Sequence, residues 1–443
     1  MSPEAMEKLW SLLLLPAPLN HIKASNFTRV NCVLLNKKTA ATLSYFRSKP
    51  ELIKHLFKHS GSAAIMDLML KLVSVEDLPD GSGTIKWLRD EGLIPHLVDN
   101  LDPRLDAETH TTASQALMDI ISVSYQSLMP PDQLNPLGQP IETPPSVISG
   151  AGSILIDELK TEKHLKKLVS FMLDRDAPHS TSSLTCGINI LMEIIRKYCS
   201  EIEHVEMLQH EYQLYVQGSR GFASPPTSEK LDLLATDLSD LLNVVYDHLN
   251  QFSSFLQHPK DTPEFIETTM GRQPPVGWVR LKICELMAEL MHVQYLFTSS
   301  PMFDFFVNPP PLPEKPEDST TKTIDASKPK VVDCLIKISN GLVQENIAIT
   351  CVTLFFAFRW NNFLHSVVYD MLAKMFNAFT YTCPLPSPTT TITPNSGEDV
   401  KQFEVPSAIP PASLLGQTKL KQLREAIKKF IISVCYLIYL HFF

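Results

Sequence analysis

Two histidines, His55 and His59, have the spacing that most directly suggests metal chemistry. Side chains four residues apart lie on one face of a helix, and two imidazoles so placed can hold a single Zn²⁺ ion. No glutamate follows the first histidine as in the H-E-x-x-H motif, and Lys54 and Lys58 occupy neighbouring positions. The pattern therefore indicates a solvated basic helix surface. We expect no metal site and no bound cofactor.

Short motifs that mark catalytic sites are missing from the sequence. There is no G-x-S-x-G turn, no Walker loop and no G-x-G-x-x-G loop. His204 and His210 lie among glutamates, which is typical of an acidic helix surface. A cysteine–histidine nucleophile pair could still assemble in three dimensions, but nothing in the local sequence indicates one. We expect no catalytic residue and a protein that is not an enzyme.

Residues 360–365, WNNFLH, combine two large aromatic side chains with two adjacent amides. A buried amide without a hydrogen-bond partner costs about 1–3 kcal/mol, so a helical core has no need of this combination. One interpretation is a partner-binding surface. The alternative is that both rings are buried between helical repeats while the asparagines cap helix ends. The candidate partner-binding residues in this block are Trp360, Asn361, Asn362, Phe363 and His365.

The composition is that of a folded, acidic protein. Hydrophobic residues make up 44% and charged residues 20% of the 443 residues, which is enough material for a large core. The formal net charge is −9 and no basic stripe stands out, so we expect no nucleic-acid partner. Fifteen glycines against 34 prolines disfavour folds that depend on phosphate-binding loops or tight hairpins.

Cysteine usage indicates a reducing compartment. The eight cysteines are scattered, with no C-x-x-C pair, and most have apolar neighbours, where cysteine behaves as a small hydrophobic residue. The N-terminus also lacks the positive region and the long apolar region of a secretory signal. We expect a cytoplasmic protein, with the nucleus as a second compartment.

Helical periodicity predicts an all-α fold. In residues 113–128, 184–198 and 231–249, apolar side chains recur three and four positions apart, as one face of a helix requires. Helices of 10–20 residues joined by short turns cannot bury their apolar faces singly. We therefore expect an α-solenoid of degenerate armadillo-like or HEAT-like repeats with long proline-rich loops. The short helical units predicted near the N-terminus are 38–46, 51–58, 63–73 and 85–100, with Pro95 marking a second start or a kink in the last.

Polar, proline-rich stretches divide the helical array. We expect an N-terminal helix and lead-in over 1–27, a helical-repeat domain over 28–380 and a proline-, serine- and threonine-rich linker over 381–416. Residues 417–443 are expected to form a C-terminal helix that ends in an apolar run. Long exposed loops are predicted within the repeat domain at 129–148, 218–229, 258–277 and 307–330.

The chain ends in the apolar run FIISVCYLIYLHFF, directly after Lys428 and Lys429. A membrane span requires about 20 residues, so the run is short for a transmembrane helix. Three interpretations stay open: a buried last helix, a short tail anchor, and a truncated or misassembled chain end. We favour a protein without a membrane partner.

Five blocks carry a resemblance to a known family. They occur in order at 34–50, 62–68, 87–98, 278–293 and 360–370, and they include WVRLKI, which begins at Trp278, and WNNFLH. Their order and spacing together, and no single block, make the resemblance specific. Together they resemble the SAPS family, the phosphatase-associated regulatory subunits, over roughly residues 28–380. The resemblance implies a helical-repeat protein.

The same resemblance implies a function. SAPS proteins are regulatory subunits that bind the catalytic subunit of a type-2A-related Ser/Thr phosphatase, of the protein phosphatase six class, and act in cell-cycle progression and signalling. The alternative is a helical-repeat adaptor, tail-anchored to a membrane, with no phosphatase partner.

Trp278 and Arg280 form a second group of candidate partner-binding residues. In the alternative interpretation the tryptophan belongs to the core of a repeat and the arginine lies on its surface. Met66 and Asp67, in the SAAIMDL block, are predicted to lie in the core and on the helix surface respectively.

Overall fold

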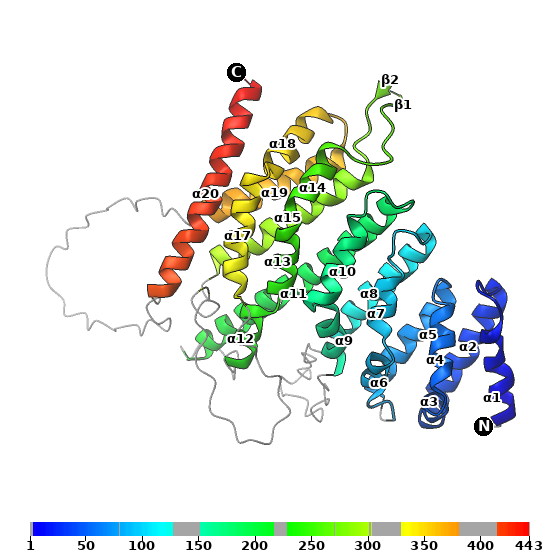
Figure 1. Cartoon of the computed structure of the whole chain (residues 1–443). Coiled ribbons are helices and arrows are strands. Elements are labelled where there is room, and N and C mark those ends of the chain that lie inside the picture. The colour runs from blue at the N-terminus through cyan, green and yellow to red at the C-terminus, as the bar shows by residue number, and fades with distance from the viewer. Residues whose placement is uncertain are drawn as a thin grey trace. The chain divides into compact units, whose positions relative to one another are not determined.

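The computed structural model describes residues 3–78, 80–126, 151–216, 228–269, 271–300, 303, 329–380 and 414–442. The described residues are almost entirely helical, which confirms the all-α prediction (Figure 1). The predicted loop at 129–148, and most of those at 218–229 and 307–330 and of the linker at 381–416, lie outside the described residues.

The chain divides into two compact units. Unit 1 comprises Met1–Lys197, His258–Glu264 and Gly277–Ile283, and unit 2 comprises Tyr198–Gln257, Phe265–Val276 and Cys284–Phe443. Two long helices, α11 (Ser180–Val216) and α15 (Trp278–Ser299), contribute residues to both.

Unit 1 is a succession of helices in which neighbours along the chain pack on one another, as α2 does on α3, α6 on α7 and α7 on α8 (Figure 1). Its further elements are α1 (Pro3–Trp10), η1 (Ser11–Leu14), α2 (His21–Lys37), α3 (Thr39–Arg47), α4 (Pro50–Lys58), α5 (Ala63–Ser74), η2 (Val75–Asp77), α6 (Thr84–Asp90), α7 (Leu93–Asp99), α8 (Ala107–Gln126), α9 (Ala151–Leu159) and α10 (Glu162–Met172). As predicted, Met66 is buried and Asp67 is exposed.

The predicted unit 85–100 is two helices, and glycine explains the break. Gly92, between α6 and α7, has φ 82°, a backbone conformation that residues with a Cβ rarely adopt. Pro95 lies in the first turn of α7, where its missing N–H has no intrahelical acceptor to lose. The proline therefore marks a second start, as one of the two predicted interpretations has it.

An aromatic cluster forms the N-terminal part of the core of unit 1. The Trp10 ring lies 5.2 Å from Phe27 and 4.6 Å from Phe46, measured between ring centroids. Trp10 Nε1 donates a hydrogen bond to Asn31 Oδ1 at 3.2 Å, and Asn31 Nδ2 donates to the Phe27 carbonyl at 2.8 Å. Both buried polar groups are thus satisfied, and α1 is tied to α2.

Unit 2 is built around α17, which packs against α13, α18 and α20. Its elements besides α11 and α15 are α12 (Ser228–Thr236), α13 (Ser239–Asp247), α14 (Leu249–Gln257), β1 (Ile266–Thr268), β2 (Gly271–Gln273), α17 (Val331–Gln344), α18 (Ile347–Ala357), α19 (Asn362–Thr380) and α20 (Leu414–Phe442). The helical spacing of apolar residues at 231–249 extends over three helices, because tight turns separate α12, α13 and α14. Ser239 Oγ donates to the Thr236 carbonyl at 2.7 Å in the first of these turns.

A small β-hairpin departs from the helical pattern. β1 and β2 pair antiparallel, with Ile266 opposite Gln273, inside the segment 258–277 that was predicted as a loop. Most of its residues are exposed, in agreement with the predicted exposure of this segment.

The C-terminal helix α20 packs on α17, α18 and α19. Within its apolar run, Phe430, Ile431 and Val434 are buried, whereas Ile432 and Tyr436 are exposed. None of the helices that the structure describes is long and apolar enough to cross a membrane.

Candidate partner-binding surface

The block at 360–365 lies at the turn from α18 to α19. The Phe358 N–H donates to the Leu354 carbonyl at 3.0 Å and closes the end of α18, and the Asn361 N–H donates to the Phe358 carbonyl at 3.1 Å. On the other side of the turn, Leu364 is fully buried and anchors the start of α19. Hydrogen bonds and packing therefore fix the backbone of the turn from both sides.

Both aromatic side chains of the block project into solvent. Trp360 is 70% exposed and Phe363 is 77% exposed, so the interpretation that buries both rings between repeats is wrong. On α19, Tyr369 is 72% exposed and Phe376 is also exposed. At 100° per residue, Tyr369 and Phe376 lie about 120–140° around α19 from Phe363. We therefore refer only to Trp360 and Phe363, at the turn and in the first turn of α19, as the α19 aromatic surface. Exposed aromatic side chains of this size are typical of protein–protein interfaces.

The two asparagines have different roles. Asn361 Oδ1 accepts a hydrogen bond from the Leu364 N–H at 2.9 Å, which caps the first turn of α19. Asn362 is the first residue of α19, and its side chain is exposed to solvent. The capping predicted in the alternative interpretation therefore applies to Asn361, while the Asn362 amide is accessible to a partner.

His365 supports the turn from within unit 2. Its Nε2 donates to the Phe355 carbonyl at 3.1 Å, and its ring centroid lies 4.4 Å from that of Phe355. The side chain is half-buried. These contacts link α19 back to α18, so His365 holds the turn in place.

Replacing Asn361 with alanine is expected to lower the free energy of unfolding of unit 2 by about 1 kcal/mol, because the Leu364 N–H loses its cap. Asn361→Asp retains an acceptor oxygen and should restore most of the stability. Denaturant titrations followed by circular dichroism measure the difference, with Asn362→Ala as the matched control, for which we expect a change within about 0.5 kcal/mol. Equal losses for the two alanine variants would contradict the capping role.

Trp278 and Arg280 lie in unit 1, at the start of α15. Trp278 is 71% exposed, so the interpretation that places it in a repeat core is wrong. The preceding Gly277 has φ 79°, and a Cβ there would lie 2.7 Å from Thr262 Oγ1. This close approach fixes the backbone from which Trp278 projects. Arg280 is half-buried and makes contacts within the chain.

The prediction that His55 and His59 lie on a solvated helix surface is wrong for His59. His59 is buried with its Nε2 2.9 Å from the Leu13 carbonyl, an arrangement in which the nitrogen donates to the backbone. In the part of the chain that the structure describes, no group of three or more His, Cys, Asp or Glu side chains could hold a metal ion.

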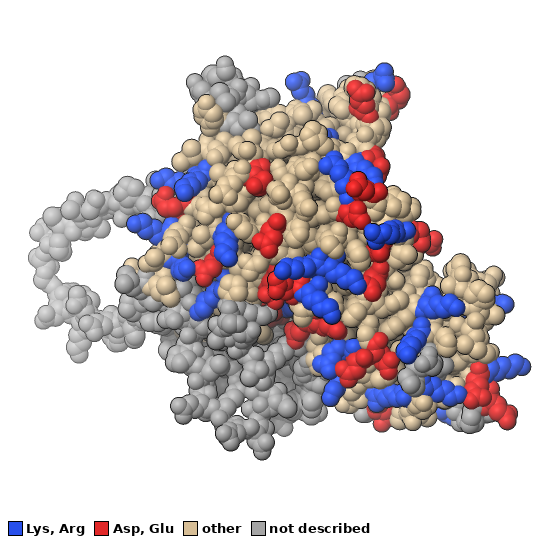
Figure 2. Space-filling model, in the orientation of Figure 1, with Lys and Arg blue, Asp and Glu red and all other residues tan. Residues whose placement is uncertain are grey.

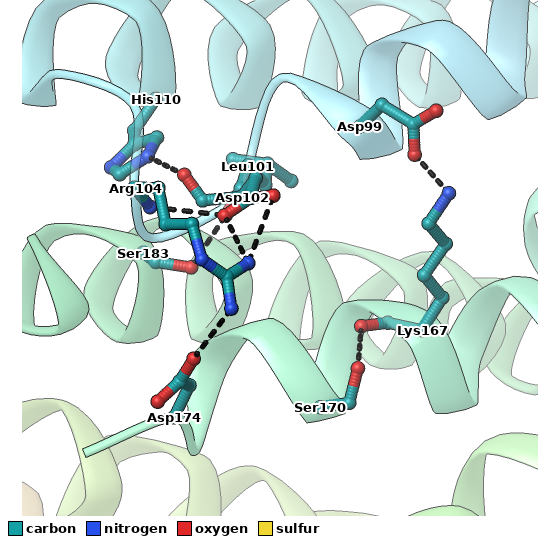
Figure 3. A network of polar contacts seen from close by, with 9 residues as sticks. All are labelled: Asp99, Leu101, Asp102, Arg104, His110, Lys167, Ser170, Asp174 and Ser183. Atoms are coloured by element: carbon teal, nitrogen blue, oxygen red, sulfur yellow. Dashed lines mark hydrogen bonds and ion pairs between the residues drawn. The ribbon is translucent and has the colours of Figure 1, made fainter. Parts of the chain in front are cut away.

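A polar network in unit 1 was not predicted from the sequence (Figure 3). It fixes the loop 101–106, between α7 and α8, by binding three consecutive carbonyls. The bonds run from Ser183 Oγ to Leu101 at 2.7 Å, from His110 Nε2 to Asp102 at 2.8 Å, and from the His179 N–H to Pro103 at 2.9 Å. The Ser183 bond joins residues 82 positions apart, and no local sequence pattern could reveal it.

The loop presents Arg104 in a fixed orientation. Its guanidinium group donates to both Asp102 carboxylate oxygens, at 3.2 and 3.3 Å, and lies 3.7 Å from Asp174 Oδ2 (Figure 3). The Arg104 side chain is nevertheless 67% exposed. An ion pair between Lys167 and Asp99 links α10 to α7 beside it. In unit 1, the loop 101–106 therefore exposes the Arg104 guanidinium group in an orientation that Asp102 and Asp174 hold.

Unit 1 is expected to lose stability as the pH falls below about 6.5, the usual histidine value. Burial lowers the pKa of both His96 and His110 in the folded chain. Because the unfolded histidines bind protons more readily, their contribution is fully present above the unfolded pKa and is lost as the pH falls through the folded values. Melting temperatures measured between pH 8 and pH 5 give the dependence of stability on pH. This dependence should be weaker in the double variant that carries His96→Gln and His110→Gln. An unchanged pH dependence in that variant would contradict the assignment.

A comparison with protein families identifies the chain. The model of the SIT4 phosphatase-associated protein family, SAPS, matches residues 31–385. The chain belongs to the SAPS family. The resemblance read from the five blocks is thereby confirmed, and the matched SAPS region includes the α19 aromatic surface, Trp278 and the network around Arg104.

Three proteins similar to this chain share 24–27% of its sequence over the aligned region. The chain is 27% identical to Extragenic suppressor of kinetochore protein 1 of Schizosaccharomyces pombe, over 84% of this chain and 53% of that protein. It is 27% identical to SIT4-associating protein SAP190 of Saccharomyces cerevisiae, over 65% of this chain and 25% of the relative. The chain is 24% identical to Serine/threonine-protein phosphatase 6 regulatory subunit 3-B of Xenopus laevis, over 82% of this chain and 34% of that protein. The chain thus spans about half or less of these proteins, and no solved structure matches it.

Proposed function

We propose that this chain is a regulatory subunit that binds the catalytic subunit of a type-2A-related Ser/Thr phosphatase and directs its activity. The observation that carries the proposal is the SAPS match over 31–385, together with relatives named as a SIT4-associating protein and a phosphatase 6 regulatory subunit. In this proposal the chain itself is not an enzyme, and its role is to present binding surfaces. It acts in the cytoplasm and the nucleus, in cell-cycle and signalling control.

The α19 aromatic surface is the contact that we assign to the catalytic subunit. Aromatic side chains dominate the binding energy of many interfaces, and each buries about 150–250 Å² when covered. Trp360 and Phe363 stand on a turn that the Asn361 cap and the His365 hydrogen bond already fix. Little conformational entropy is therefore lost when a partner covers them, which favours affinity.

Trp278 is a second contact in this proposal, and it lies in unit 1. The helical units of the chain are degenerate armadillo-like or HEAT-like repeats, and such arrays offer extended surfaces for large protein partners. Support comes from the packing of successive helices, α2 on α3, α6 on α7 and α17 on α18.

Affinity purification of the tagged chain from its native cells, followed by mass spectrometry, tests the proposal. We expect a type-2A-related catalytic subunit in near-stoichiometric amount. A chain that carries Trp360→Ala and Phe363→Ala is the control, and it should recover much less of that subunit at the same expression level. Recovery of other complexes without any phosphatase catalytic subunit would overturn the proposal.

A further inference from the structure

Basic side chains are concentrated near the N-terminus of this acidic chain. Residues 20–60 contain eight lysines and arginines and a single acidic residue, Glu51, although the whole chain has 48 acidic and 39 basic residues. This local excess of basic residues contrasts with the net charge of −9 of the whole chain, on which the expectation of no nucleic-acid partner rests. Figure 2, in the orientation of Figure 1, shows basic side chains over the part of the surface where α1 to α5 lie.

One helix of this segment, α2, places its cations among exposed apolar side chains. Lys23, Arg29 and Lys37 are exposed, and α2 carries no aspartate or glutamate. At 100° per residue, these positions and the apolar ones between them fall within about a third of the helix circumference. We define the α2 basic face as Ile22, Lys23, Arg29, Val30, Val33 and Lys37.

The apolar members of the face are well exposed. Ile22 is 67%, Val33 52% and Val30 45% exposed. The opposite side of α2, with Phe27 and Leu35, is buried and packs on α3 and α5. The core of unit 1 thus holds the helix in place without using the α2 basic face.

The cations of the face have no polar partner among the residues that the structure describes. Across the described ranges, Lys23, Arg29 and Lys37 form neither a side-chain hydrogen bond nor an ion pair. By contrast, the nearby Lys49 pairs with Glu7 at 2.7 Å. Because the three cations of the face lie on one side of a helix without an ion-pair partner among the described residues, they create a positive potential, which complements the negative charge of an acidic binding partner.

We propose that the α2 basic face binds an acidic amphipathic segment of a partner protein. The apolar side chains of the partner would cover Ile22, Val30 and Val33, while its carboxylates would pair with the flanking cations. From residue 22 to residue 37 the face is about 23 Å long at 1.5 Å per residue, which suits a helix of about 16 residues. The proposal does not depend on binding to the phosphatase, because the α2 basic face belongs to unit 1 whereas the α19 aromatic surface belongs to unit 2.

Three other occupants fit the face less well. A second copy of the chain would bring its own cations against these cations, and like charges in contact are repulsive. A bilayer surface is usually bound through large side chains such as Trp, Phe and Leu, whereas this face offers β-branched residues with Asn26 among them. Nucleic acid would contact the cations through its phosphates but would leave the exposed apolar side chains unused.

The test uses the full chain and a defined probe. The probe is a 16-residue peptide of Ala, Leu and Glu with an N-terminal fluorescein and an amidated C-terminus, with leucines along one helical face and glutamates beside them. Fluorescence anisotropy should show binding in the micromolar range that weakens several-fold between 50 and 300 mM NaCl. The variant K23E/R29E/K37E should bind at least about 10-fold more weakly, because three favourable charge pairs become repulsive. A matched variant with exposed lysines elsewhere, K86E/K428E/K429E, should bind like the wild type.

Circular dichroism first confirms that both variants are folded. The proposal is overturned if the acidic peptide does not bind, or if the two triple variants weaken binding equally. It is also overturned if phosphatidylserine vesicles or single-stranded RNA bind through the α2 basic face more tightly than the peptide does. Sedimentation velocity that shows self-association through Lys23, Arg29 and Lys37 would overturn it as well.

Discussion

A chain with Trp360→Ala and Phe363→Ala is expected to bind the phosphatase catalytic subunit at least about 30-fold more weakly than the wild type, a loss of about 2 kcal/mol. Both side chains are at least 70% exposed, so they contribute little to the packed core of unit 2. The free energy of unfolding should therefore stay within about 0.5 kcal/mol of the wild-type value. Biolayer interferometry with immobilised catalytic subunit measures the affinity, and thermal unfolding checks the fold.

The control for this variant is Tyr436→Ala. Tyr436 lies on α20 and is 64% exposed, so it matches Trp360 in type and exposure but lies outside the α19 aromatic surface. Its substitution should change the affinity less than about 3-fold, as expected of a residue outside an interface. If both variants bind as tightly as the wild type, the α19 aromatic surface is not the contact with the phosphatase.

Substituting Trp10 by alanine is expected to destabilise unit 1 by about 3–5 kcal/mol. The ring is 2% exposed and contacts both Phe27 and Phe46, so its removal leaves a cavity among α1, α2 and α3. The Asn31 Oδ1 acceptor also loses its bond from Trp10 Nε1. Alanine replaces neither the ring contacts nor this hydrogen bond, so the free energy of unfolding should fall by an amount near the upper end of the range of about 3–5 kcal/mol. Differential scanning calorimetry of the full chain measures it.

Trp10→Phe is the matched comparison for that experiment. It retains most of the apolar volume and removes the indole donor, so we expect about half the loss or less. A destabilisation below about 1 kcal/mol for Trp10→Ala would contradict the packing described for the N-terminal core.

The bounds of several helices could be predicted closely from the sequence, because apolar residues at helical spacing extend over the whole length of each of these helices. The predicted units 63–73 and 51–58 correspond to α5 (Ala63–Ser74) and α4 (Pro50–Lys58). The region 231–249 could not be divided correctly. Apolar residues continue at helical spacing through the turns between α12, α13 and α14, so periodicity alone does not show the breaks.

The sequence singles out the candidate residues, but it does not decide whether their side chains are exposed or buried. Tryptophan and phenylalanine are found in cores and in interfaces, and the sequence contains no signal that separates the two for Trp360 and Phe363. For the same reason the sequence leaves both interpretations of Trp278 open, and the structure decides for exposure. Arg104 could not be recognised at all, since its fixed orientation depends on Asp174, 70 positions away, and on bonds from α8 and α11 to its loop.

The central claim is that the chain binds a phosphatase catalytic subunit directly. Isothermal titration calorimetry of the purified chain with a purified type-2A-related catalytic subunit is the measurement that tests it most directly. We predict a 1:1 complex with a dissociation constant below about 1 μM, because several aromatic anchors on a fixed scaffold supply about 8 kcal/mol or more. Absence of measurable binding at about 50 μM of both folded proteins would contradict the account.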